Sequence, residues 1–447
     1  MNKKILALLA ALCLMAGCLA GCTGGKEPDE PDTVDYAGQV TLDMESDTLK
    51  QEVTVKTYID GDTTHFYVPT DVVDNGLLKA RYIGVNTPES TGKIEAWGKK
   101  ASNFTKEKLQ GADSIIIESD DGNWNVDSTG GRYLVWVWYR PAGTESYRNL
   151  NIELLQNGLS IASATGDNRY GDVAMEALMQ AKEQGIHVHS KEKDPDFYYG
   201  EAIPVTLKGL RANIELYRDM KVAFEATIVV NNSQTVYVED YDAETDMYYG
   251  MNCYYGYNLT GTGLDILQEG NRVRFVGSVQ YYEAGDSWQV SDIKYVDMRP
   301  TDPNNIQLIS SGHEGSYREV SALEFASGVL EVDKLESLED EEPAPQVVKF
   351  AQMALGTSLS FKNLTVIDVY TTTNEDSASK GAMTLTCRAE DGTIVSVRTV
   401  VLRDKNGDVI TYEAYAGKTI NVRGVVDCYQ GQYQLKVFTP DDIEIVG

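Results

Sequence analysis

Three short segments in the first half of the chain carry side chains that suit a phosphate group and a hard cation. In the first, Asp60 and Asp62 flank one glycine at the end of a strand-like run. A tight bend at this point can place a carboxylate oxygen on a cation. In the third, DSTGGR (residues 127–132), a glycine-rich loop presents the guanidinium of Arg132, whose planar fork of donors matches a phosphate. Each segment taken alone is also typical of an ordinary hairpin turn or loop tip.

The second segment, RYIGVNTPE, spans residues 81–89. On a strand, the side chain of Arg81 points to one face and that of Asn86 to the other. A Thr-Pro turn follows, in which proline fixes φ, and Glu89 comes directly after it. The same pattern is compatible with a strand that ends in a proline turn and carries Arg81 as a surface charge. Asn86 stands where a carboxylate is the more natural metal ligand, although its amide oxygen also suits Ca²⁺.

These segments lie in a block, residues 50–198, that alternates strand-like and helix-like patterns. Apolar residues recur at period two in five runs and at helical spacing in three others. The predicted strands are EVTVKTYID, THFYV, LLKARYIGV, SIIIES and RYLVWVWYR, and the predicted helices are EAWGKKASNFTKEKLQG, NLNIELLQNG and YGDVAMEALMQAKEQG. Five strands with helices between and after them predict a small OB-type barrel covered by helices.

The order of the three segments resembles that of the staphylococcal-type thermonuclease family. YIDGDT is similar to the family's strand and metal-binding aspartate, and ARYIGVNTPES to its segment of arginine, metal ligand, Thr-Pro and glutamate. GGRYLVWVW is similar to its second arginine and the following strand. The resemblance covers this block alone. It implies an endonuclease that hydrolyses the phosphodiester bonds of DNA and RNA with little sequence preference and leaves 3′-phosphate ends.

The resemblance also implies a role for each of the residues singled out. A Ca²⁺ ion would be held by a carboxylate oxygen of Asp62, by Asn86 and by the backbone carbonyl of Thr87. Glu89 would be the general base that takes a proton from the attacking water. Two arginines would clamp the scissile phosphate and stabilise the charge that grows on it: Arg81 and Arg132. Such groups meet the needs of phosphodiester hydrolysis, which are an oriented water, a base and fixed positive charge.

The chain departs from the family's pattern in ways that concern metal and substrate binding. Asn86 replaces a carboxylate, so we expect weaker metal binding rather than none. The loop before Arg132 is one residue longer and lacks the tyrosine that the family packs on the nucleotide. A second tyrosine of the family is also missing, and Tyr170 is the candidate to replace it. The general base and both arginines are retained.

The remainder of the chain predicts two diverged copies of one OB-like β-barrel module, at residues 199–300 and 318–447. The stretch NRVRFVGSVQYYEAGDSWQVSDIKYV is similar to KTINVRGVVDCYQGQYQLKVFTPDDIEIV, and each has a strand leading into a glycine, an aromatic turn and another strand. The overall fold class is therefore mainly β with some α: a thermonuclease-like barrel with helices, followed by two small barrels.

The N-terminus predicts a bacterial lipoprotein that is anchored at the extracellular face of the cell membrane. Residues 1–21 combine two lysines with a short apolar run, as in a signal peptide. They end in Leu-Ala-Gly before Cys22, which resembles a lipobox and predicts a lipid on Cys22. The alternative is a plain secretion signal. Residues 22–49 begin with a polar, acidic and proline-rich stretch that predicts a disordered tether. Beyond it, only one disulfide is conceivable within one domain, between Cys387 and Cys428.

The charge of the chain restricts how it can bind nucleic acid. The net charge is −29, so general electrostatic attraction to phosphate is excluded and any attraction must be local, for example through a bound divalent cation. A membrane-anchored Ca²⁺-dependent nuclease that acts on DNA or RNA is the leading hypothesis, and a fragment ending at residue 198 is expected to carry the activity. The alternative is a non-catalytic surface lipoprotein that binds its partner through the OB-like modules.

Overall fold

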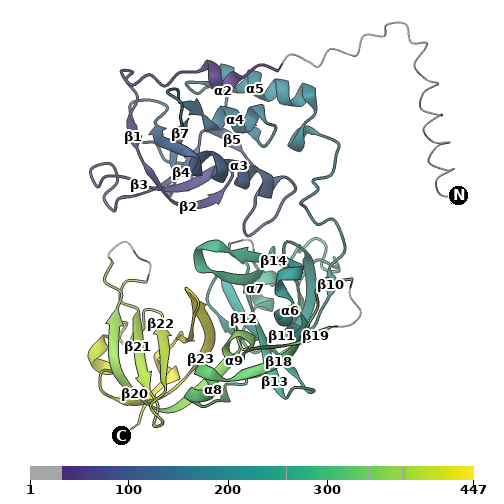
Figure 1. The fold of residues 1–447 in the computed structure, drawn as a ribbon, viewed down its shortest axis with the longest axis vertical. Coiled ribbons are helices and arrows are strands. Elements are labelled where there is room, and N and C mark those ends of the chain that lie inside the picture. Colours follow the sequence, from purple (N-terminus) through teal and green to yellow (C-terminus); the bar gives the residue numbers. More distant parts are fainter. Residues whose placement is uncertain (1–32, 258, 340–342, 375–376, 378, 447) are drawn as a thin grey trace, which may run out of the picture.

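The structure is a computed structural model that describes residues 33–446, apart from 258, 340–342, 375, 376 and 378 (Figure 1). The predicted signal peptide and Cys22 lie outside the described residues. The described part of the predicted tether, residues 33–49, is not a free chain. It contains helix α2 (Tyr36–Gln39), whose Ala37 is fully buried. Arg148 donates two hydrogen bonds to Asp35, of 2.7 and 2.8 Å, and so holds this segment on the first barrel. The tether prediction is therefore wrong for this part, because the prediction weighed its polar composition and missed its apolar anchor.

The first barrel has the strand order β1-β6-β7-β4-β3-β2, with β4 and β7 parallel and β8 at the edge. Only Val53 separates β1 from β2, so the two ends of this path are almost one continuous strand and the sheet closes on itself. Trp136 and Trp138 of β7 are fully buried, and both pack against Tyr170, which precedes the last helix of this barrel. The strands are β1 (Lys50–Glu52), β2 (Thr54–Asp60), β3 (Thr63–Tyr67), β4 (Leu77–Tyr82), β6 (Ala112–Glu118), β7 (Tyr133–Pro141) and β8 (Arg148–Asn149). The predicted OB-type arrangement, mainly β with helices, is confirmed.

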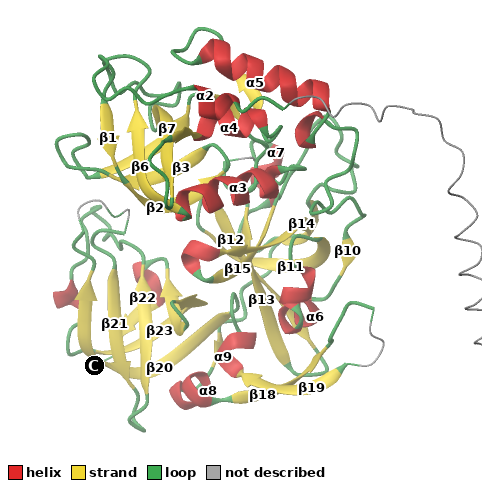
Figure 2. Cartoon of the chain, turned by 45° about the horizontal axis from the view of Figure 1, so that its top comes forward, coloured by secondary structure: helices red, strands yellow, loops and turns green. Residues whose placement is uncertain are grey.

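Three helices and a short strand pair complete the first barrel. Helix α3 (Gly98–Gln110) follows β5 (Gly84–Asn86), and α4 (Leu150–Gln156) and α5 (Gly171–Gln184) pack against each other beside α2 (Figure 2). Strand β5 pairs with β9 (Ile161–Ser163). The side chain of Asn149 caps the N-terminus of α4 by accepting the Ile152 N–H, and Gly185 ends α5 in a left-handed conformation.

The second barrel is closed by pairing of its first and fourth strands, in the order β11-β12-β13-β15-β14-β11. Its third and fifth strands, β13 and β15, are parallel. The elements are β10 (Ile203–Pro204), α6 (Leu207–Ala212), β11 (Lys221–Asn231), β12 (Thr235–Asp242), β13 (Met247–Tyr254), α7 (Thr262–Ile266), β14 (Arg272–Tyr282), β15 (Ser287–Ser291) and β16 (Gln307–Ser310).

The third barrel repeats this order as β20-β21-β22-β24-β23-β20, again with a parallel pair, β22 and β24. A hairpin, β18 and β19, lies between the second and third barrels in the chain. The elements are β17 (Arg318–Glu319), α8 (Ala322–Ser327), β18 (Val329–Lys334), β19 (Ala344–Lys349), α9 (Phe350–Met353), β20 (Ser358–Thr371), β21 (Met383–Arg388), β22 (Ile394–Thr399), β23 (Thr419–Tyr429), β24 (Gln432–Val437) and β25 (Ile443–Ile445).

The glycines shared by the two predicted repeats have a common structural cause. A Cβ atom on Gly277 of β14 would lie 2.4 Å from the Ser291 carbonyl oxygen, and one on Gly424 of β23 would lie 2.3 Å from that of Lys436. In both barrels, the fourth strand therefore crosses the fifth at a distance that only glycine allows.

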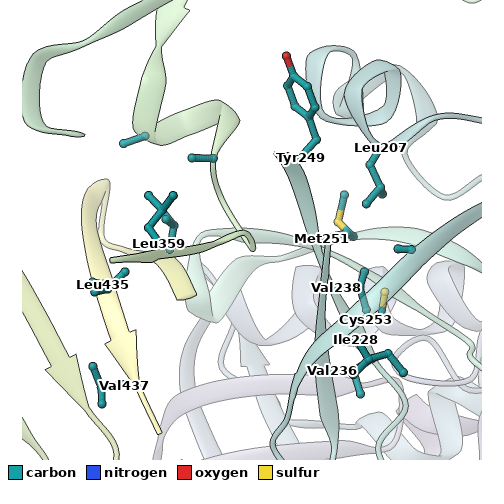
Figure 3. Packing of buried hydrophobic residues seen from close by; sticks show 14 of the residues in the cluster. Leu207, Ile228, Val236, Val238, Tyr249, Met251, Cys253, Leu359, Leu435 and Val437 are labelled. Carbon is teal, nitrogen blue, oxygen red and sulfur yellow. The ribbon is translucent and has the colours of Figure 1, made fainter. Parts of the chain in front are cut away.

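One cluster of buried apolar side chains runs through the second and third barrels (Figure 3). It includes Val238 and Met251 from the second barrel and Leu359 and Leu435 from the third. The first barrel has a separate core. The cysteines at 253, 387 and 428 are all free. In the described part of the chain, no helix is long and apolar enough to cross a membrane.

Candidate active site

The sheet register of the first barrel brings two of the three predicted segments together. The β2–β3 hairpin places Asp60 and Asp62 at its turn, and Thr63, which begins β3, pairs with Arg81 near the end of β4. The Tyr82 N–H donates to the carbonyl oxygen of Asp62 over 2.9 Å. The segment with Asp60 and Asp62 is thus a hairpin turn, as one interpretation of the sequence allowed. Its carboxylates also face the RYIGVNTPE segment.

Arg81 lies at the centre of the cluster and joins two predicted metal ligands. Its Nη1 donates to Oδ1 of Asp62 in a short ion pair, and its Nη2 donates to Oδ1 of Asn86 over 2.6 Å. The Thr87 N–H donates to the other oxygen of Asp62 over 2.8 Å, and the Thr63 hydroxyl donates to the first over 3.0 Å. Asp62, Arg81, Asn86 and Thr87 therefore meet in one place, and residue 86 faces the cluster.

The carboxyl groups of this cluster are crowded and withdrawn from solvent. Asp60 is 6% exposed and Asp62 is 1% exposed. Burial, together with the charge of Glu89, raises the pKa of Asp60 to about 6. Burial and the charge of Asp60 raise the pKa of Asp62 to about 7, although Arg81 opposes this. Burial, followed by the charge of Asp62, also raises the pKa of Glu89. Added positive charge would relieve this repulsion.

The backbone of Glu89 is held by the residues that lead into helix α3. The Glu89 N–H donates to Oε2 of Glu95 over 3.1 Å, and the Glu95 N–H donates to the Glu89 carbonyl oxygen over 2.9 Å. Gly98, the first residue of α3, packs so closely that a Cβ there would lie 2.2 Å from that same carbonyl oxygen. The buried carboxylate of Asp194 accepts the N–H of Trp97 over 2.5 Å and fixes the start of the helix.

Arg132 is placed on the neighbouring strand but outside the cluster. The residue after it, Tyr133, pairs with Ala80 of β4, so Arg132 lies beside the strand that carries Arg81. Its guanidinium pairs with Asp127 over 2.7 Å, and its side chain is 36% exposed. The structure therefore does not join Arg132 to Asp62 or Glu89, and the arginine has to leave Asp127 to reach a phosphate between them.

The sequence prediction omitted several groups that shape the site. Glu95 and Gly98 hold the backbone of Glu89, and the Ser160 hydroxyl accepts the Asn86 N–H over 2.8 Å. Glu95 and Gly98 have no motif of their own, and Ser160 lies 74 residues from Asn86. Tyr170, the candidate replacement for a missing tyrosine, donates its hydroxyl to Glu118 over 3.0 Å. Its polar end is thus engaged within the barrel.

The donor atoms around Arg81 have the chemistry that a hard cation requires. The side-chain oxygens of Asp62 and Asn86 and the backbone carbonyl of Thr87 are oxygen donors, as Ca²⁺ prefers. The donors do not form a ready-made cage, because Arg81 already engages one oxygen of Asp62 and that of Asn86. Among the residues that the structure describes, no three His, Cys, Asp or Glu side chains form a group that could hold a metal ion. The residues present fit a cation in chemistry, and the fit requires Arg81 to release them.

Residues 79–190 match the family model described as staphylococcal nuclease homologue. The match includes Arg81, Asn86, Thr87, Glu89 and Arg132, whereas Asp62 lies before its first residue. The chain therefore contains a staphylococcal nuclease-type domain in a mainly β protein. No curated protein matches the chain.

Proposed function

We propose that the first barrel is a Ca²⁺-dependent endonuclease that hydrolyses phosphodiester bonds of DNA or RNA with low sequence specificity. One observation carries the proposal: a single guanidinium, that of Arg81, bridges Asp62 and Asn86 beside the peptide that leads to Glu89. A planar fork that binds two oxygen acceptors can exchange them for two oxygens of a phosphate. The family match over residues 79–190 supports the same reaction class.

The residues of the cluster divide the reaction between them. Arg81 binds the phosphate, and Arg132 adds a second positive charge from the neighbouring strand. Their charges oppose the negative charge that grows on the phosphoryl oxygens as water attacks. As the oxygen of the attacking water bonds to phosphorus, Glu89 accepts the proton that the water loses. The phosphorus–oxygen bond of the leaving group breaks, and the departing oxygen takes up a proton from solvent. The pKa of Glu89 is raised towards neutral pH, and a general base works best when its pKa is close to the working pH.

Asp62, Asn86 and the Thr87 carbonyl are the groups that would hold Ca²⁺. When bound, the ion would supply the positive charge that polarises the phosphate and balances the buried carboxylates. Because Asn86 contributes no charge, we expect Ca²⁺ to bind more weakly than it would with a second carboxylate. Binding would also free Arg81 for the substrate, because the ion and the guanidinium compete for the same oxygens.

A non-catalytic function for the two C-terminal barrels is the second candidate. It is favoured by a cavity of about 850 Å³ whose lining comes from all three barrels. Tyr254 and Tyr282 of the second barrel and Tyr429 of the third lie on its wall. Cavities of this size are typical of ligand sites, and tyrosine rings suit flat ligands.

The proposed location of the protein rests on its sequence alone. We propose that the mature chain is anchored at the extracellular face of the membrane through a lipid on Cys22, with DNA or RNA outside the cell as its substrate.

The substitution Glu89→Gln tests the catalytic proposal because it removes the base and keeps its shape. We expect the full chain to cleave single- and double-stranded substrates with Ca²⁺ and to stop when a chelator is added. The kcat of Glu89→Gln should fall by about 10² or more. Glu107→Gln, an exposed change on helix α3, is the matched control and should retain full activity. Absence of Ca²⁺-dependent cleavage by the wild type, or equal kcat values for the two variants, would reject the proposal.

A further inference from the structure

The second barrel contacts the segment that directly follows Glu89. The Nε2 of Gln280 donates to the carbonyl oxygen of Ser90 over 3.0 Å. The backbone N–H of Asp292 donates to the carbonyl oxygen of Gly92 over 2.6 Å. Gln280 lies on β14 and Asp292 follows β15, which is paired with β14. Two adjacent strands of one barrel therefore bind two carbonyls of a loop that belongs to another.

Helix α3, which lies at the other end of this loop, is bound to the second barrel as well. Lys99 forms an ion pair with Asp219, and Lys106 forms one with Glu283 over 2.6 Å. Helix α3 begins at Gly98 against the Glu89 carbonyl, and this close packing ties the helix to the loop more firmly than the exposed ion pairs do. The loop's own hydrogen bonds hold its ends, and the second barrel holds the middle.

The amide of Gln280 is itself held in one orientation. Its Oε1 accepts the hydroxyl of Ser291, which is fully buried. With the oxygen engaged in this way, the Nε2 points at Ser90. Glu89, the residue before Ser90, is half-buried. Hydrogen bonds at Ser90 and Gly92 restrict the movement of the backbone that adjoins Glu89.

We propose that Gln280 and the Asp292 backbone are positioning groups of the nuclease site, so that the second barrel completes the active centre of the first. This inference rests on the proposed nuclease function. It also changes the expectation that a fragment ending at residue 198 carries the whole activity. Such a fragment keeps the arginines and Glu89, but lacks the partners of Ser90 and Gly92. The second barrel is thereby assigned a role that needs no ligand of its own.

The test uses the full-length chain with the substitution Gln280→Glu. This isosteric change keeps the acceptor for Ser291 and replaces the donor with an oxygen that repels the Ser90 carbonyl. A second variant, Gln280→Met, removes the donor without adding charge. The control is Glu283→Gln, which breaks an exposed ion pair between the same two barrels but leaves the loop contacts intact. Such a pair contributes little to docking.

Two readouts are measured for each variant whose melting curve shows a folded chain. Amide hydrogen exchange over residues 89–95 reports the mobility of the loop. Steady-state kinetics separate kcat from KM. We expect both Gln280 variants to exchange faster in this segment and to lose about five- to tenfold in kcat with KM within twofold, as loss of one hydrogen bond predicts. The control should match the wild type in both.

Unchanged exchange or unchanged kcat in both Gln280 variants would overturn the inference. An equal loss in Glu283→Gln would also overturn it, because the effect would then come from barrel docking in general. If the wild type has no nuclease activity, the proposed function fails by itself. The exchange measurement then still decides whether the second barrel holds the loop.

Discussion

Restoring a carboxylate at residue 86 is the perturbation that examines the centre of the site. The side-chain oxygen of Asn86 accepts Nη2 of Arg81 over 2.6 Å, and its backbone N–H is engaged separately with Ser160. Asn86→Asp therefore changes the charge at the Arg81 fork and leaves the backbone contact in place. The new carboxylate would lie on the same guanidinium as Asp62.

The magnitude follows from the charges that the change brings together. Two unit charges about 4 Å apart near a protein surface interact by about 4 kcal/mol, and a divalent ion doubles this to about 8 kcal/mol. In the metal-free protein, the new carboxylate gains about 4 kcal/mol from Arg81. It loses this attraction when Ca²⁺ takes the place of the guanidinium. Residue 86 is partly exposed, so solvent reduces both values. Since 1.4 kcal/mol is a factor of ten, even a small remainder should lower the half-saturating Ca²⁺ concentration by about tenfold or more.

Calorimetric titration of Ca²⁺ and the Ca²⁺ dependence of cleavage should show this shift together. Asn103→Asp, which adds the same charge on the exposed face of α3, is the matched control and should leave the titration unchanged. Without Ca²⁺, Asn86→Asp should melt at a lower temperature than the wild type, because the repulsion from Asp60, Asp62 and Glu89 together outweighs the attraction of Arg81, which Asp62 already engages. If both variants need the same Ca²⁺ concentration as the wild type, residue 86 does not contact the ion and the assigned metal site is wrong.

Two further predictions concern the groups around this centre. Because the pKa of Asp60 is raised from 3.8 to about 6, the folded state binds this proton more tightly, and its contribution to stability is lost as pH rises from about 4 to 6. In the presence of a chelator, Asp60→Asn should therefore be about as stable as the wild type at pH 4.5. At pH 8 its free energy of unfolding should be higher by up to roughly 3 kcal/mol, measured by thermal melting. A difference that does not change with pH would contradict this. In Gly98→Ala, the added Cβ would overlap the Glu89 carbonyl, so unfolding free energy should fall by about 1–3 kcal/mol and kcat should fall with it, whereas Ser102→Ala on the same helix should affect neither. Wild-type kcat in Gly98→Ala would show that the position of Glu89 does not depend on the helix.

Local patterns in the sequence were sufficient to predict the first barrel and the two segments that meet around Arg81. Alternating apolar residues identified its main strands, because a strand with one buried face carries its core residues at period two. The motif around Arg81 identified the segment that meets Asp62. The repeated glycines identified two related barrels, because a close crossing of strands four and five leaves a mark in the sequence of each copy.

Contacts between distant residues could not be predicted in the same way. The pairing of Arg81 with both Asp62 and Asn86 depends on side-chain directions that no spacing rule fixes. The hydrogen bond from Gln280 to Ser90 joins residues 190 positions apart, and neither residue belongs to a motif. The burial of Ala37 is a similar case, since one apolar residue in a polar stretch gives no periodic signal.

The three barrels share one strand order, so the differences between them must explain why chemistry is assigned to one alone. At the turn between its first two strands, the first barrel carries Asp60 and Asp62 against Arg81. The second barrel has Asn232, Ser233 and Gln234 at the corresponding turn, between β11 and β12. Neutral side chains there provide no charge for a cation and no partner for an arginine. If both proposals hold, the same fold carries the reactive cluster in one copy and, in the next, strands that position the loop after Glu89.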